Sequence, residues 1–123
     1  MPSPPKPPHL LVVDDDEGLL ILMGEALRTA GYATEIATST KAARVWLADH
    51  RPDMLILDLK LRDGNGPALV AELQRAQARV PFIVVTGQGD EKVAVEVMKQ
   101  GALDYVIKDT RLLDALPVAV QRA

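Results

Sequence analysis

Five short runs of apolar residues recur along this 123-residue chain, separated by stretches with helical spacing. The runs are Leu10–Val13, Ala33–Ala37, Met54–Leu57, Phe82–Val85 and Tyr105–Ile107. Three of them, LLVV, MLIL and FIVV, are apolar throughout rather than alternating, as expected of strands buried on both faces. This alternation of strands and helices predicts an α/β fold with a five-stranded parallel sheet covered by helices on both sides. Asp90 is expected to cap the helix that follows it.

Composition narrows the class of protein. Aromatic residues make up 3% of the chain, so the core has to be built from aliphatic side chains. The formal net charge of -3 argues against a surface that binds nucleic acid or an anionic membrane. The absence of cysteine excludes disulfides and thiolate metal sites. No apolar run approaches the roughly 18 residues of a membrane span. We therefore expect a cytoplasmic domain that contacts neither nucleic acid nor membrane.

Prolines affect the structure expected at both ends of the chain. Residues 1–8, MPSPPKPP, hold five of the nine prolines and are expected to form a disordered leader before a single domain over residues 9–123. Pro117 suits the first turn of a helix but not its interior, so the final helix is predicted to begin near Leu116 or Pro117. A helix of about two turns would cover a sheet edge poorly, and we expect the natural chain to continue beyond Ala123.

Polar residues follow the apolar runs. In parallel α/β sheets, ligands bind beyond the carboxyl ends of the strands. The residues that leave the first, third, fourth and fifth strands there are Asp14, Asp15, Asp16, Asp58, Thr86 and Lys108. An acidic run at a strand end is commonly a solvated loop that complements a helix dipole. Asp58, however, directly follows the buried MLIL run, where a lone carboxylate is costly unless paired. The doubly wound strand order 2-1-3-4-5 would bring it to the acids after the first strand.

This set of residues suits phosphoryl chemistry. Clustered carboxylates repel one another unless a cation lies between them, and oxygen ligands favour Mg²⁺ over a transition metal. The loop is not a nucleotide-phosphate cradle, because it lacks glycines and is negatively charged. A phosphoryl group in transfer spreads its charge over three oxygens, which Mg²⁺, Lys108 and the Thr86 hydroxyl can share. The central carboxylate of Asp58 can serve as the nucleophile and become an aspartyl phosphate.

With these residues in place, the chain resembles the receiver domain of two-component response regulators from residue 9 to residue 123. The matching stretches are LLVVDDDEG, LILDLKLRDGNG, FIVVTG and GALDYVIK. The resemblance implies a flavodoxin-like three-layer sandwich, Mg²⁺ as the cofactor and Asp58 as the phospho-acceptor. The implied metal ligands are Asp14, Asp15, Asp58 and the backbone carbonyl of Lys60. Thr86 and Lys108 are implied to bind the phosphoryl oxygens.

The resemblance also implies a switch and its partners. Thr86 would move toward the phosphoryl group, Tyr105 would fill the space it leaves, and the face of the fourth helix, fifth strand and fifth helix would change shape. Gly87, Lys60 and Gln88 are implied to control access and phosphoryl lifetime. The implied donor is a histidine kinase or phosphotransfer protein, the output module lies beyond the last residue, and the switch face allows a homodimer. Such a domain is no enzyme in the usual sense, since it catalyses only its own phosphorylation and dephosphorylation.

Three positions depart from the family pattern. Lys108 is followed by Asp109 rather than by the usual proline with a cis bond, and a cis bond before a non-proline costs about 3 kcal/mol, so a trans bond is predicted. Arg62 replaces a common proline, which leaves its turn less fixed. Lys60 places a cation two residues after Asp58, and we expect it to affect the phosphoryl lifetime.

Two alternatives remain at this point. A haloacid-dehalogenase-like phosphatase also uses an aspartate nucleophile, Mg²⁺, a hydroxyl and a lysine, and Asp14-x-Asp16 resembles its D-x-D motif. That motif is not followed here by the expected threonine, and no acidic pair follows Lys108. The other alternative is a degenerate receiver that is never phosphorylated and acts only as a protein-binding module. The complete acidic set argues against it.

Overall fold

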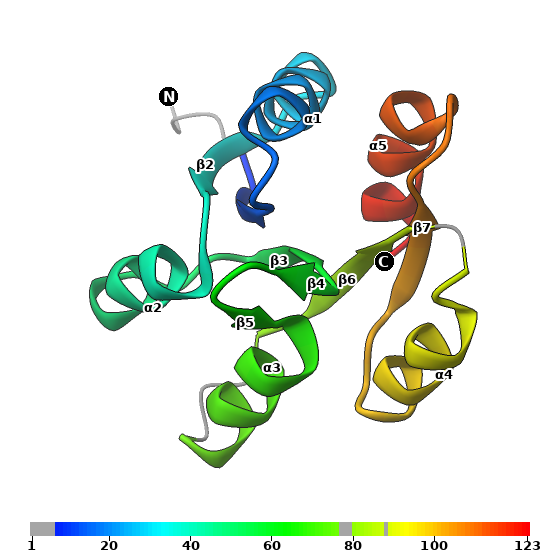
Figure 1. Cartoon of the computed structure of the whole chain (residues 1–123). Coiled ribbons are helices and arrows are strands. Elements are labelled where there is room, and N and C mark those ends of the chain that lie inside the picture. Colours follow the sequence, from blue (N-terminus) through cyan, green and yellow to red (C-terminus); the bar gives the residue numbers. More distant parts are fainter. Residues whose placement is uncertain (1–6, 77–79, 88) are drawn as a thin grey trace.

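The computed structural model describes residues 7–76, 80–87 and 89–123. Its main sheet has five parallel strands. These are β1 (His9–Val13), β2 (Ala33–Ala37), β3 (Met54–Asp58), β6 (Phe82–Thr86) and β7 (Asp104–Ile107). Across the sheet they lie in the order β2-β1-β3-β6-β7 (Figure 1). Counted along the strands of this sheet alone, this is the predicted order 2-1-3-4-5, and the α/β doubly wound fold is confirmed.

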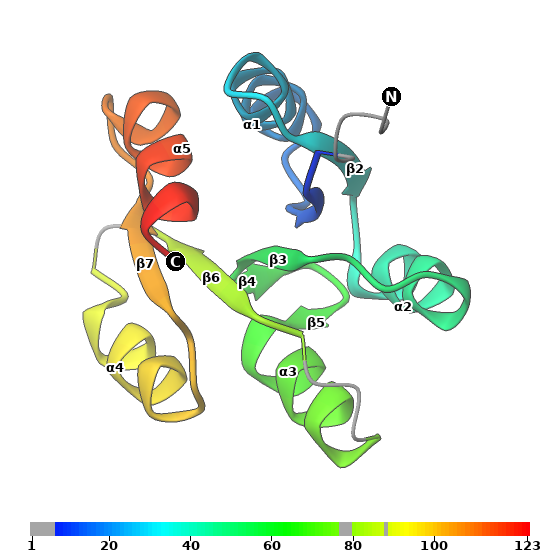
Figure 2. The same ribbon diagram turned by 180° about the vertical axis from the view of Figure 1, so that it is seen from behind.

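Helices cover both faces of the sheet and make the three layers expected of this fold. Within the described residues the helices are α1 (Glu17–Thr29), α2 (Thr40–Asp49), α3 (Gly66–Arg75), α4 (Glu91–Lys99) and α5 (Leu112–Arg122). The first and last lie on one face and the other three on the opposite face, which is clear from the front and from behind (Figures 1 and 2). None of the helices in the described part of the chain is long and apolar enough to cross a membrane.

The strands are apolar on both sides because each face of the sheet has its own core. One core lies between the sheet and the helices α1 and α5. It contains Val12, Ile56 and Ile83 of the strands together with Leu20, Met23 and Leu116 of the helices. The adjacent strand residues Val13, Leu57 and Val84 point to the other face, where Leu69 of α3 and Val97 of α4 are buried. Full burial of such a side chain stabilises the fold by about 1.5–3 kcal/mol. The two-sided core explains why LLVV, MLIL and FIVV lack alternation.

The predicted start of the last helix was wrong. The helix begins at Leu112, and Pro117 lies inside it. Leu112 and Leu116 are both buried in the core beneath α1, and burying two leucines offsets the roughly 3 kcal/mol that an interior proline costs. The helix therefore has about three turns, enough to cover this part of the sheet.

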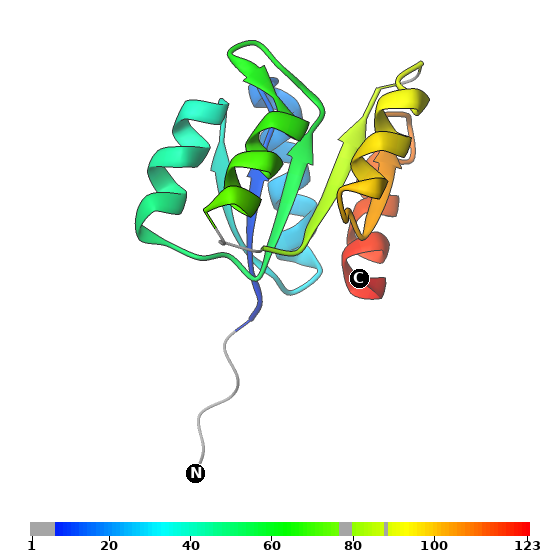
Figure 3. The same ribbon diagram turned by 90° about the horizontal axis from the view of Figure 1, so that it is seen from below.

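A second small sheet follows β3 and was not predicted. It is an antiparallel hairpin of β4 (Lys60–Leu61) and β5 (Gly64–Asn65). In Figure 3 the strands of the main sheet run upward, and the hairpin lies above the carboxyl end of β3. The start of α3 fits tightly beneath it, since a Cβ atom on Gly66 would lie 2.8 Å from the carbonyl oxygen of Asp58. The hairpin thus sits at the edge of the sheet where the polar residues gather.

Candidate functional site

Four strands deliver polar side chains to one edge of the sheet. Asp14 follows β1, Asp58 ends β3, Thr86 ends β6, and Lys108 follows β7. The parallel register sets Asp58 opposite Val85 and Thr86 opposite Ile107, so these ends are level. The backbone N–H of Lys108 donates to the Thr86 carbonyl at 2.8 Å and extends that ladder by one residue. The convergence follows from the strand order.

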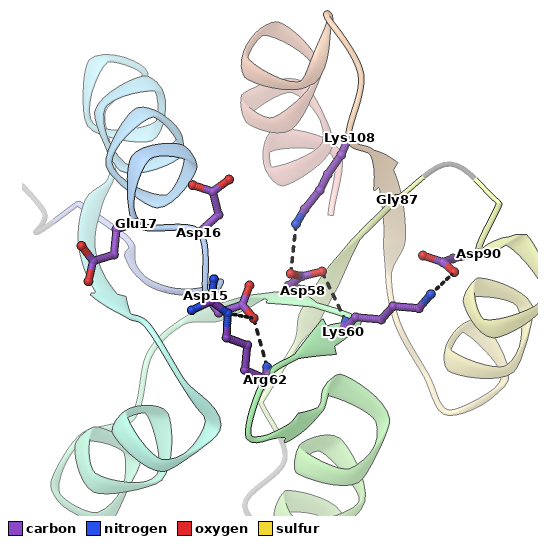
Figure 4. Close-up of a pocket in the computed structure, with 9 residues that line it drawn as sticks. All are labelled: Asp15, Asp16, Glu17, Asp58, Lys60, Arg62, Gly87, Asp90 and Lys108. Atoms are coloured by element: carbon purple, nitrogen blue, oxygen red, sulfur yellow. Dashed lines mark hydrogen bonds and ion pairs between the residues drawn. The ribbon is translucent and has the colours of Figure 1, made fainter.

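The three consecutive acids after β1 have different surroundings. Asp14 is 0% exposed, and its Oδ1 accepts a hydrogen bond from the Asp16 N–H at 2.9 Å. Asp15 points toward Arg62, whose N–H donates to Asp15 Oδ2 at 3.0 Å (Figure 4). Asp16 caps α1 by accepting from the Leu19 N–H. Only the first two acids therefore belong to the cluster, and the third has the helix-capping role that an acidic strand end commonly has.

A carboxylate oxygen from each of Asp14, Asp15 and Asp58 lies within 4.8 Å of the others. Asp58 is 5% exposed, so two of the three carboxylates are buried. Asp14 Oδ2 accepts no hydrogen bond; Lys108 Nζ lies 3.0 Å away, an ion-pair distance without hydrogen-bond geometry. A buried oxygen-only set with an unfilled acceptor matches the ligands that hard cations such as Mg²⁺ prefer. The residues present therefore fit a magnesium ion.

Lys108 is the cation that pairs with the two buried acids, while the exposed Arg62 side chain places its Nε 3.8 Å from Asp15 Oδ2. Lys108 Nζ donates to Asp58 Oδ2 at 2.9 Å (Figure 4). Burial lowers the pKa of Lys108, but its contacts with Asp58 and Asp14 outweigh this and the pKa is raised. Burial raises the pKa of Asp58 to about 6; the hydrogen bond from Lys108 opposes this, and the charge of Asp14 adds to it. One ammonium thus serves two buried carboxylates.

Thr86 and Tyr105 lie at the border of the site. Thr86 is buried, and its hydroxyl donates to the Gly87 carbonyl at 3.2 Å rather than to Asp58. Tyr105 is 44% exposed on β7. It lines a cavity of about 350 Å³ against α4. The structure therefore places Thr86 beside the acids and Tyr105 outside them, over the α4 side of the sheet.

The mouth of the site contains contacts that the sequence did not predict. The cavity above Asp58 has a volume of about 730 Å³. Lys60 Nζ and Asp90 Oδ1 form an ion pair of 2.8 Å beside it (Figure 4). Asp90 is the N-cap residue of α4, as predicted, but its side chain makes no cap bond: its carboxylate is held by Lys60 instead. A Cβ on Gly87 would lie 3.3 Å from Asp90 Oδ2, which makes this approach narrow.

Two further sequence predictions concern the loops around the site. Gln88, predicted to modulate access, lies outside the described residues, as do residues 1–6 of the predicted leader. The bond between Lys108 and Asp109 is trans, as predicted, and so is every other peptide bond of the described residues. The carboxylate of Asp109 accepts from the Arg111 N–H at 2.9 Å.

Comparison with known proteins gives one consistent family. Residues 10–119 match the sequence model described as the response regulator receiver domain. The photosynthetic apparatus regulatory protein RegA of Rhodobacter capsulatus is 36% identical over 99 residues, which are 80% of this chain and 54% of that protein. The transcriptional regulatory protein GlrR of Escherichia coli is 37% identical over 118 residues, 96% of this chain and 26% of that protein. The chain thus spans about half or about a quarter of these relatives.

Solved structures agree with the sequence matches. NtrX from Brucella abortus superimposes with a TM-score of 0.87 and 28% identity, covering 95% of this chain and 26% of that one. A response regulator receiver domain protein from Clostridium thermocellum gives a TM-score of 0.83 with 26% identity, covering 94% of this chain and 92% of that one.

Proposed function

Because this chain belongs to the response regulator receiver domain family, we propose that it is the phospho-acceptor of a two-component phosphorelay and that Asp58 is phosphorylated. The observation that carries the proposal is the meeting of Asp14, Asp15 and Asp58 with the Lys108 ammonium at one sheet edge. The pKa of Asp58 is raised to about 6, so at neutral pH its carboxylate is still ionised and can act as a nucleophile.

The phosphoryl donor is a phosphohistidine on a histidine kinase or phosphotransfer protein. A carboxylate oxygen of Asp58 attacks the phosphorus, the new O–P bond forms as the N–P bond breaks, and the imidazole nitrogen leaves with the electron pair of that bond. The Lys108 ammonium, which donates a hydrogen bond to Asp58 Oδ2 before the reaction, then donates to a phosphoryl oxygen. The Thr86 hydroxyl turns from the Gly87 carbonyl to a second oxygen. Hydrolysis of the aspartyl phosphate later restores the carboxylate.

The proposed metal ligands are Asp14, Asp15, Asp58 and the backbone carbonyl of Lys60. Mg²⁺, when bound, would offset the negative charge of the carboxylates and of the phosphoryl oxygens. The buried Oδ2 of Asp14 accepts no hydrogen bond and has only its ion pair with Lys108, which supports this assignment. Within the chain, Asp14 and Asp58 fix the position of Lys108, so the acids also orient the cation that meets the phosphoryl group.

The output is a change on the face of α4, β7 and α5. When Thr86 moves toward the phosphoryl group, the half-exposed Tyr105 turns inward and fills the space that Thr86 leaves. The exposed apolar side chains Val95 and Met98 of α4 border the cavity beside Tyr105 and change their surroundings with it. This face then binds an output module beyond residue 123 or a second copy of the domain. The domain works in the cytoplasm and catalyses only its own phosphorylation and dephosphorylation.

Labelling with a small phosphoryl donor tests the proposal. Wild type and Asp58→Asn are incubated with acetyl phosphate, with and without Mg²⁺, and their intact masses are compared. One phosphoryl group on wild type, dependent on Mg²⁺ and absent from the variant, is expected. Labelling that survives in Asp58→Asn would refute the role of Asp58 and favour the phosphatase alternative, whose nucleophile is Asp14. Absence of Mg²⁺-dependent labelling would favour the degenerate receiver.

A further inference from the structure

The hairpin after β3 is too small to hold its own position. Its strands β4 and β5 pair over only two residue pairs, Lys60 with Asn65 and Leu61 with Gly64. An isolated two-stranded hairpin is at best marginally stable even when longer. Yet this hairpin carries the Lys60 carbonyl and forms one wall of the acidic pocket. Its placement must therefore come from contacts with the rest of the domain.

The two residues at the tip of the hairpin, Arg62 and Asp63, have contacts on opposite sides. The Arg62 N–H donates to Asp15 Oδ2 at 3.0 Å, on the side of the acids. Asp63 turns away from the acids to the first turn of α2. Its Oδ1 accepts from the Thr40 N–H and its Oδ2 from the Lys41 N–H, each at 3.0 Å. These contacts hold the tip between the acidic cluster and α2.

Helix α2 has a local cap in addition to Asp63. Ser39 is the N-cap residue, and its hydroxyl accepts from the Ala42 N–H at 2.9 Å. A local cap of this kind is the usual means of starting a helix. The second pair of bonds comes from Asp63, which lies 23 residues beyond Thr40. Asp63 therefore completes the cap begun by Ser39 and, unlike Ser39, ties the helix start to the hairpin.

The start of α2, which receives Asp63, packs closely against the hairpin and is linked to α3. Thr40 is buried, and a Cβ on Gly64 would lie 3.3 Å from its Oγ1, so the hairpin packs directly on the start of α2. Arg44 of α2 binds both carboxylate oxygens of Glu72 on α3, at 2.7 and 2.8 Å. Helix α2 is thereby tied to the helix that follows the hairpin.

We propose that Asp63 is a positioning residue for the acidic site: by binding the start of α2, it holds the Arg62 N–H against Asp15 Oδ2 and the Lys60 N–H, 3.4 Å from Asp58 Oδ1, against Asp58. The carboxylate is ionised for this role, since the backbone N–H groups of Thr40 and Lys41 lower its pKa. The part of the inference that concerns Mg²⁺ rests on the proposed function. The part that concerns the hairpin does not.

The test compares Asp63→Ala with Ser39→Ala, which removes the local cap of the same helix. Amide hydrogen exchange of Arg62 is measured by NMR on the metal-free protein, and the Mg²⁺ Kd by calorimetry. Loss of a capping interaction is expected to change the equilibrium constant between closed and open local structure by about tenfold. Asp63→Ala is therefore expected to speed Arg62 exchange and to raise the Mg²⁺ Kd by up to about tenfold. Ser39→Ala is expected to lower the unfolding temperature similarly while changing neither value by more than about twofold.

Asp63→Asn keeps one acceptor oxygen and is expected to fall between wild type and Asp63→Ala; it also gives the comparison if the alanine variant does not fold. Arg62 exchange that is unchanged in Asp63→Ala, or that rises as much in Ser39→Ala, would overturn the inference. If wild type binds no Mg²⁺ and takes no phosphoryl group, the proposed function fails. The exchange of Arg62 in metal-free protein still tests Asp63 in that case.

Discussion

Replacing Asp58 by asparagine is expected to stabilise the metal-free protein at neutral pH, although it removes an ion pair. Burial raises the pKa of the Asp58 carboxyl from 3.8 to about 6; Lys108 opposes this only in part, and the charge of Asp14 adds to it. The ionised carboxylate is therefore less stable in the folded protein than in the unfolded chain. Asparagine has nearly the shape of the protonated acid and cannot ionise.

The pH dependence follows from that pKa. Between about pH 4 and about pH 6 the folded protein keeps a proton on Asp58 that the unfolded chain has released, so the stability of wild type falls as the pH rises through this window. A pKa difference of this size corresponds to about 3 kcal/mol. Asp58→Asn is expected to be about 2–3 kcal/mol more stable than wild type near pH 7.5, with the difference shrinking toward zero near pH 4.

Urea unfolding followed by the fluorescence of Trp46, the single tryptophan, measures this difference. The titrations are done in the presence of a chelator at several pH values between 4 and 8. Asp49→Asn is the control, because Asp49 is exposed and the same charge is removed. The argument from burial would be refuted if Asp58→Asn were no more stable than wild type near pH 7.5. It would also be refuted if the gain in stability did not shrink as the pH falls.

Two other substitutions test the surroundings of Asp58. Lys60→Ala breaks the 2.8 Å ion pair with Asp90 at the mouth of the site. It is expected to speed dephosphorylation by a few fold, because water reaches the phosphoryl group more easily. An unchanged phosphoryl lifetime in a decay assay would contradict this. Gly66→Ala puts a Cβ 2.8 Å from the Asp58 carbonyl oxygen and is expected to cost about 1–3 kcal/mol of stability by thermal unfolding. Gly18→Ala, whose Cβ meets only an ordinary 3.6 Å contact, is its control, and equal losses in both would argue against the steric reason.

The strands and the acidic cluster could be predicted because both depend on a short-range signal. Runs such as MLIL are apolar on every residue, which only a strand with helices on both sides requires. The cost of burying the Asp58 carboxylate alone required the first and third strands to be neighbours, and the known doubly wound order 2-1-3-4-5 meets that requirement. The structure has that order and brings Asp58 to Asp14 and Asp15.

What could not be predicted depends on contacts between distant residues. The proline rule placed the start of the last helix at Leu116 or Pro117, but the burial of Leu112 and Leu116 starts the helix earlier. Asp90 has the sequence position of a helix cap, yet Lys60, 30 residues before it, takes its carboxylate. These outcomes are set by packing and ion pairing in the folded chain, which local propensity does not contain.

The most direct test of the central claim is to locate the phosphoryl group on the wild-type chain. After acetyl phosphate treatment the acyl phosphate is reduced, and tandem mass spectrometry identifies the modified residue. The account predicts modification of Asp58 alone, and only when Mg²⁺ is present. A modified Asp14 or Asp15, or the same yield at Asp58 with a chelator as with Mg²⁺, would contradict it.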